Sequence, residues 1–232
     1  MKQYCEGLLA AALQVILVYP FDILRVKYFV QEGTADLQLY NGLAFSLIAS
    51  IIKLSLIYPN QHFLTEHLFR EYPLFGNAIL GILLGLMTTP INIIKIPIQL
   101  DGNKSVWKVM QDIWKLHGIK GFFHGGLATI GRDFSWTISY FQIFQQLQQR
   151  QFDNLLIIVI ASLIATTISY PFDCVRLYQQ IYFNQSHSID GLKQSLSLTR
   201  SNLQGFLVSN ARVTVATLIG HGTYLWLSSS IK

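Results

Sequence analysis

A hexapeptide of the form Pro-x-acid-x-x-base occurs in two intact copies and one near-copy in this 232-residue chain, each time near the end of an apolar run. The first copy begins at Pro20 and the third at Pro171, and in both a Tyr comes directly before the Pro, giving Tyr-Pro-Phe-Asp. The second copy begins at Pro90 but has Asn92 in the acidic position. Copies of one motif that recur along the chain, here 70 and 81 residues apart, indicate an internal repeat, which constrains the whole fold. We predict one domain, 1–232, built from repeats at approximately 1–70, 71–150 and 151–232.

The composition points to a membrane environment. Hydrophobic residues make up 51% of the chain and charged residues only 12%, whereas a typical soluble domain has about 25% charged residues. Several apolar runs approach the roughly 20 residues that a spanning helix needs. Charged residues recur at the ends of these runs, which favours helices packed around a polar interior. The sequence therefore predicts an all-α membrane protein.

The repeats predict six transmembrane helices, two in each pseudo-symmetric repeat. A short amphipathic helix is expected over 107–116 after the second motif, and a short polar helix after the third. The predicted spanning helices lie near 4–29, 41–69, 75–99, 124–149, 154–180 and 203–229.

The three motifs predict a ring of ion pairs. A proline inside a helix removes one hydrogen bond and kinks the axis, and residues three apart lie on the same helix face. With threefold pseudo-symmetry, each acid can meet the base of the next repeat. The predicted pairs are Asp22 with Lys95, Asp173 with Arg25, and Arg176 with Asn92 through an uncharged hydrogen bond.

These motifs resemble those of the mitochondrial carrier family, in which Pro-x-acid-x-x-base is followed by Gln nine residues after the Pro. Gln99 and Gln180 match that Gln, and Phe29 departs from it. The second family motif, Gly-x-x-Gly-aromatic-aromatic-x-Gly, is matched over 118–125. The resemblance covers nearly the whole chain and implies a multi-pass protein of the mitochondrial inner membrane, with short helices and a gate on the matrix side. The implied gate residues are Pro20, Asp22, Arg25, Pro90, Asn92, Lys95, Gln99, Pro171, Asp173, Arg176 and Gln180.

The resemblance also implies a solute site. Family members bind solute at contact points seven and eight residues after the Gly that opens each even-numbered helix. Counting from Gly125 gives Arg132 and Asp133, and the last repeat gives Arg212. An adjacent base and acid resembles carriers of amino acids and of S-adenosylmethionine, whose carboxylate and ammonium groups the pair can meet. Trp136, one turn further, is placed to stack on a base or a cation.

In the first repeat two helix registers remain open. If the stretch at 40–42 opens the second helix, the contact point falls at Ala49 and Ser50, with Lys53 as a further cavity candidate. If a later Tyr-Pro-Asn-Gln stretch marks the middle of that helix, the contact point falls at 56–57. We favour the first register because it leaves a helix long enough to span.

Two departures from the family pattern support two functional hypotheses. Asn92 removes one charge from the ring, and glutamines follow Phe144 where the family's opposite gate usually has an acid and a base. In the first hypothesis the protein is a carrier that moves a small zwitterionic or anionic metabolite. In the second it is a transport-inactive structural subunit of a larger inner-membrane assembly, such as a respiratory complex.

Other functional classes are disfavoured. The Lys and Arg residues are scattered and no RNA-binding motif is present, so no nucleic-acid partner is expected. The sequence has no P-loop, metal-ligand cluster or Gly-x-Ser-x-Gly motif. We therefore expect no enzyme activity, catalytic residue, metal or cofactor. The expected partners are membrane lipids, with cardiolipin as a bound lipid, and a small-molecule metabolite.

Overall fold

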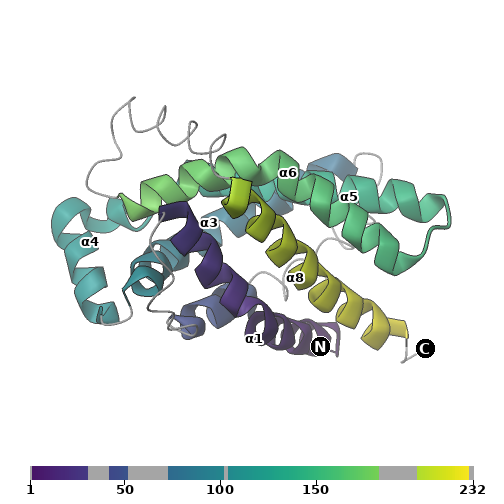
Figure 1. Cartoon of the computed structure of the whole chain (residues 1–232), viewed down its shortest axis with the longest axis horizontal. Coiled ribbons are helices and arrows are strands. Elements are labelled where there is room, and N and C mark those ends of the chain that lie inside the picture. The colour runs from purple at the N-terminus through teal and green to yellow at the C-terminus, as the bar shows by residue number, and fades with distance from the viewer. Residues whose placement is uncertain (1, 31–41, 52–72, 102–103, 183–202, 230–232) are drawn as a thin grey trace.

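A computed structural model of the chain describes residues 2–30, 42–51, 73–101, 104–182 and 203–229, and the regular elements within these ranges are helices (Figure 1). This confirms the all-α prediction for the described residues. The helices are α1 (Lys2–Val30), α3 (Pro73–Leu100), α4 (Val106–Gly121), α5 (Gly126–Gln149), α6 (Asn154–Ile181), α8 (Leu203–Ser229) and a helical stretch at 43–51.

Five of the predicted long helices lie where the sequence placed them, with ends that differ by at most two residues. The predicted helix at 41–69 is helical from 43 to 51, and its remainder lies outside the described residues. The short helix predicted over 107–116 lies within α4. The short helix predicted after the third motif also lies outside the described residues.

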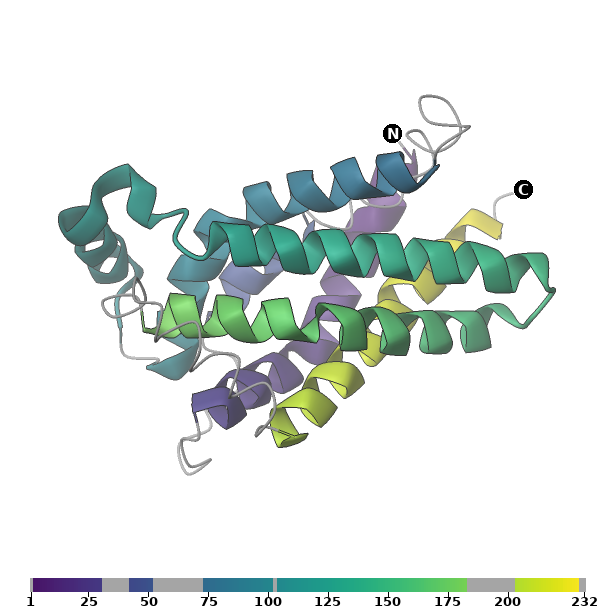
Figure 2. The same cartoon turned by 90° about the horizontal axis from the view of Figure 1, so that it is seen from above.

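The long helices form a bundle. In Figure 2, α3, α5 and α6 lie side by side while α1 and α8 cross them diagonally. The extensive packing runs from α3 to α5, α5 to α6, α6 to α8 and α8 to α1. The short helix α4 lies at one end of the bundle, and the α5–α6 turn lies at the other (Figures 1 and 2). The boundaries of the three repeats stay a prediction.

Two glycines shape the connection from α4 to α5. Gly118 (φ 60°, ψ −148°) interrupts the helix, and Gly125 (φ 72°) has left-handed backbone immediately before α5. Residues that have a Cβ rarely adopt such positive φ values. A Cβ at Gly125 would also lie 3.3 Å from Cγ of Gln180, so this turn approaches the C-terminal part of α6 closely.

The helices α1, α3 and α6 each continue through their motif proline, and α3 contains a second proline, Pro97. The largest apolar cluster joins α3, α5 and α6, where Leu84, Tyr140 and Ile157 are buried together. A second cluster joins α1, α3 and α6 just beyond the motifs, around Val26 and Ile96. The motif segments of α3 and α6 thus lie between two packed apolar clusters.

Polar and apolar side chains are distributed as expected for helices surrounded by lipid. The exposed faces of α3 and α6 carry apolar side chains such as Leu83, Met87 and Ile168, whereas Asp22, Arg25 and most other charges on the long helices are buried. Two described helices are long and apolar enough to cross a membrane by length and composition, over Leu74–Leu100 and Asn154–Ile181. Hydroxyl groups within these apolar helices are satisfied locally, because several donate to the carbonyl four residues earlier.

Candidate functional site

A cavity of about 190 Å³ lies inside the bundle, lined from α1, α3, α5, α6, α8 and the 43–51 helix. Its lining includes three carboxylates and five basic side chains among the described residues. Charges inside a helix bundle are expensive unless they are paired or serve a polar cavity. The charged lining residues are Asp22, Asp133, Asp173, Arg25, Lys95, Arg132, Arg176 and Arg212.

Two of the ion pairs predicted from the repeats are present. Lys95 Nζ lies 2.5 Å from Asp22 Oδ2 and joins α3 to α1. Arg25 Nη1 lies 2.9 Å from Asp173 Oδ2 and joins α1 to α6. These side chains are buried, with exposed fractions between 6% and 12%. Each charged group therefore contacts its ion-pair partner in place of water. The alignment of the motifs between repeats therefore predicted these two side-chain contacts correctly.

The third predicted contact is wrong. Arg176 was expected to face Asn92, but its Nη2 lies 2.9 Å from Asp173 Oδ1, three residues earlier on the same helix. The physical reason is charge: a carboxylate attracts a buried guanidinium more strongly than a neutral amide does. Asn92 is itself buried at the cavity wall. Within the described contacts, α3 and α6 are not joined by a ring ion pair.

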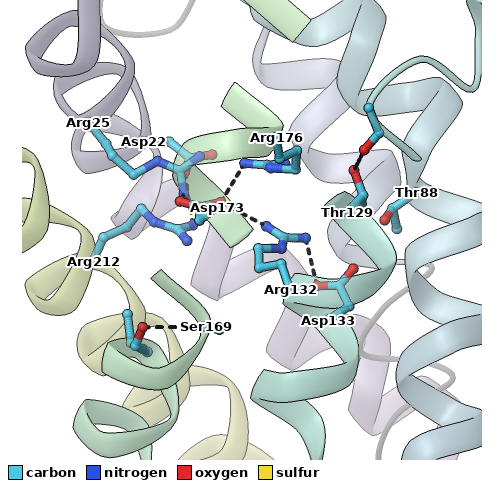
Figure 3. Close-up of polar contacts among 12 residues, drawn as sticks. Asp22, Arg25, Thr88, Thr129, Arg132, Asp133, Ser169, Asp173, Arg176 and Arg212 are labelled. Atoms are coloured by element: carbon cyan, nitrogen blue, oxygen red, sulfur yellow. Dashed lines mark hydrogen bonds and ion pairs between the residues drawn. The ribbon is translucent and has the colours of Figure 1, made fainter. Parts of the chain in front are cut away.

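Asp173 is the centre of the charged site. Figure 3 shows Arg25, Arg132 and Arg176 converging on it. Arg132 Nη1 lies 3.6 Å from Asp173 Oδ1, and its Nη2 lies 2.6 Å from Oδ1 of Asp133, its neighbour on α5. The adjacent base and acid expected from the sequence are thus paired with each other at the cavity.

Asp22 also serves two cations. Besides Lys95, it binds Arg212 of α8, whose Nη1 lies 2.9 Å from Asp22 Oδ1. The sequence placed Arg212 at the solute site, and it does line the cavity, but the ion pair to Asp22 was not foreseen. Spacing along the chain carries no signal for this pair, because it depends on how α8 packs across α1.

An uncharged cluster lies further along α5. Trp136 stacks on Tyr140 with ring centroids 4.8 Å apart, so one face of the predicted stacking residue is already occupied. The Tyr140 hydroxyl lies 2.5 Å from Nδ1 of His221 on α8, whose ring packs 4.7 Å from that of Phe144. No motif of the sequence pairs His221 with Tyr140, so the sequence did not predict this cluster. The contact links α5 to α8 in the part of the chain where the usual gate charges are absent.

Comparison with known proteins relates part of the chain to a family. The family model described as mitochondrial carrier protein matches residues 72–155. The mitochondrial aspartate-glutamate transporter of Saccharomyces cerevisiae is 25% identical over 182 residues, covering 60% of this chain and 20% of that protein. Mitochondrial substrate carrier family protein X of Dictyostelium discoideum is 28% identical over 162 residues (62% and 53%). The mitochondrial glycine transporter of Ovis aries is 20% identical over 222 residues (78% and 72%).

Over residues 72–155 the chain is similar to the mitochondrial carrier family. It spans about a fifth and about half of the first two relatives, so it is a short and partial counterpart of them. The match to the family model includes the Asn92 copy of the motif, the Gly-rich turn and the Arg132–Asp133 pair. The motif copy that has Asn92 in place of an acid therefore lies within the segment that the family model matches.

The remaining site predictions fall into two groups. Ala49 and Ser50 line the cavity, as the favoured register of the first repeat requires. Lys53 and the alternative contact point at 56–57 lie outside the described residues. Whether any of these residues contacts a solute stays a prediction.

The two motif glutamines have different surroundings. Gln99 Nε2 donates to the Tyr19 hydroxyl over 3.4 Å, and the Tyr19 ring lies beneath the Lys95 ammonium at 5.8 Å. Gln99 thereby braces the Asp22–Lys95 pair from one side. The Gln180 side chain is buried next to Gly125, and its amide has no hydrogen-bond partner. The role of Tyr19 was missed, although a Tyr before the motif proline recurs at Tyr170.

Proposed function

We propose that the protein is a multi-pass carrier of the mitochondrial inner membrane that moves a small zwitterionic or anionic metabolite by alternating access. The proposal includes six spanning helices in three repeats, with the ring of ion pairs as the matrix-side gate and cardiolipin as a bound lipid. The match of residues 72–155 to the carrier family model supports it, and so do the apolar outward faces and the charged interior of the bundle.

The charge of the cavity carries the proposal. Five basic and three acidic lining residues leave two positive charges in excess among the described side chains. At the low effective dielectric of such a site, a cationic solute would be repelled and an anionic group attracted. Arg132 can bind a carboxylate through two parallel hydrogen bonds, while Asp133 beside it can accept hydrogen bonds from an ammonium group. This combination suits a zwitterionic or anionic amino acid better than S-adenosylmethionine, whose sulfonium and ammonium groups outweigh its carboxylate.

The relatives favour the amino-acid class within this range. Two of them carry printed names that refer to aspartate and glutamate or to glycine. Alternating access would require the Asp22–Lys95 and Asp173–Arg25 pairs to separate when the cavity opens toward the matrix. Ion pairs contribute to such a gate only through the difference between the two states.

Substitution of Arg132 tests the solute site. We expect Arg132→Gln to abolish saturable amino-acid uptake into liposomes that contain the purified protein, because it removes the guanidinium that would bind the solute carboxylate. Arg150→Gln is the matched control on the same helix, since Arg150 is exposed at the end of α5. A thermal melt of both variants separates loss of function from unfolding.

Two outcomes would contradict the proposal. Unchanged uptake by folded Arg132→Gln would show that the solute does not bind at this residue. Absence of saturable uptake of glycine, L-aspartate, L-glutamate and S-adenosylmethionine by the wild type would instead favour the structural-subunit hypothesis. That hypothesis further requires the protein to co-purify with a larger inner-membrane complex in mild detergent.

A further inference from the structure

The ring of motif residues lacks one of its three connections. Lys95 joins α3 to α1 through Asp22, and Arg25 joins α1 to α6 through Asp173. By the same relation an acid at position 92 would join α3 to α6 through Arg176. Asn92 stands at that position, buried at the cavity wall, so the base of the third repeat has no acid from the second.

Arg176 consequently pairs with Asp173, which also pairs with Arg25. Its side chain is 3% exposed, and its Nη2 lies against Oδ1 of Asp173 at 2.9 Å. Arg132 approaches the same oxygen to 3.6 Å, and Arg25 occupies Oδ2 at 2.9 Å. Three guanidinium groups thus surround one carboxylate (Figure 3). In addition, Nε of Arg176 is buried without a hydrogen-bond partner.

The guanidinium groups around Asp173 outnumber the carboxylates that pair with them. Asp133 partly compensates Arg132, but Arg176 has no carboxylate of its own among the described residues. Buried guanidinium groups that are not matched by carboxylates are destabilising, because desolvation is not repaid by attraction. Arg176, Arg132 and Asn92 all line the same cavity. An acidic group entering the cavity would therefore find two guanidinium donors and one amide donor facing it.

We infer that the carboxylate of the transported solute binds at Arg176, Arg132 and Asn92, in the place of the acid that the second motif lacks. The bound carboxylate then supplies the missing connection between α3 and α6, so the solute itself completes the ring. Asn92 fits this role because its amide N–H can donate to a carboxylate, whereas an aspartate there would occupy Arg176 permanently. The inference rests on the proposed function and specifies which part of the cavity selects the solute.

The substitution Asn92→Asp tests this by filling the site from within. The readouts are thermal unfolding of the detergent-purified protein and its stabilisation by L-aspartate over a concentration series. Without ligand, we expect Asn92→Asp to melt at a higher temperature than the wild type, because the introduced carboxylate gains an ion pair with Arg176. The affinity for L-aspartate should fall roughly tenfold or more, the effect of losing a hydrogen bond to a charged group.

Two further variants keep the test decisive. Asn92→Gln retains an amide without adding charge and should bind L-aspartate with an affinity closer to that of the wild type. Arg176→Gln should lose most of the binding even though position 92 is unchanged. If either variant failed to fold, the other would still report on the site through the same melt.

The outcomes separate this inference from the proposed function. Unchanged L-aspartate affinity in Asn92→Asp, together with saturable amino-acid uptake by the wild type, would overturn the inference alone. A lower unfolding temperature for ligand-free Asn92→Asp would also contradict it, since no cationic surplus would then exist at position 92. If the wild type neither binds nor takes up any of the solutes, both proposals fail together.

Discussion

Asp173→Asn is expected to lower the stability of the protein by about 3–5 kcal/mol, the usual cost of removing one partner from a buried ion pair. The Asp173 side chain is 6% exposed and lies against Arg25, Arg132 and Arg176. Removing its charge while keeping its shape would leave three buried guanidinium groups with Asp133 as the one remaining ion-pair partner among the described contacts. For a chain of this length the unfolding temperature should fall by roughly 10 °C.

The matched control is Asp101→Asn. Asp101 lies just after α3, where its carboxylate is 48% exposed and 3.9 Å from Lys104. Exposed ion pairs contribute little to stability, so this variant should melt close to the wild type. Thermal unfolding in detergent, followed by tryptophan fluorescence, measures both. Equal unfolding temperatures for the two variants would show that Asp173 does not neutralise the arginine cluster.

Gly81→Ala and Gly85→Ala are expected to destabilise the protein although alanine favours helix formation. A Cβ at Gly81 would lie 2.6 Å from Cα of Phe134, and one at Gly85 would lie 2.6 Å from Cα of Ile130. Both clashes involve backbone atoms of α5, so α3 and α5 would have to move apart. Overpacking of this kind costs about 1–3 kcal/mol per site, and close approach through small residues is a common way for membrane helices to associate.

Gly222→Ala supplies the opposite expectation. Gly222 lies in α8, and a Cβ there would meet no atom within 4 Å. In such a position alanine stabilises a helix by up to about 1 kcal/mol relative to glycine. The unfolding temperatures should therefore change in opposite directions in the two helices. A rise for Gly81→Ala or Gly85→Ala would contradict the close packing of α3 on α5.

Much of the fold could be predicted because the repeated motif reports on it three times. The apolar runs and the motif prolines located five of the six predicted long helices to within two residues. The register between repeats also predicted the Asp22–Lys95 and Asp173–Arg25 pairs, since equivalent residues of neighbouring repeats meet in a pseudo-symmetric bundle. These predictions depended only on the apolar runs and on the positions at which the motif recurs in the sequence.

The rest of the site depended on side-chain reach, which periodicity does not encode. Arg212 meets Asp22 across two helices that are almost the whole chain apart in sequence. Arg176 contacts Asp173 because Asn92 offers no charge, a competition that the motif pattern does not rank. Likewise, the contact between Tyr140 and His221 joins two positions that belong to no motif.

Uptake of three amino acids that differ in net charge most directly tests whether the cavity selects solutes by its positive excess. Liposomes containing the purified protein would be offered glycine, L-aspartate and L-lysine separately, with protein-free liposomes as the control. The five basic and three acidic lining residues predict saturable uptake of glycine or L-aspartate, and none of L-lysine. Saturable uptake of L-lysine, or of none of the three, would contradict the account.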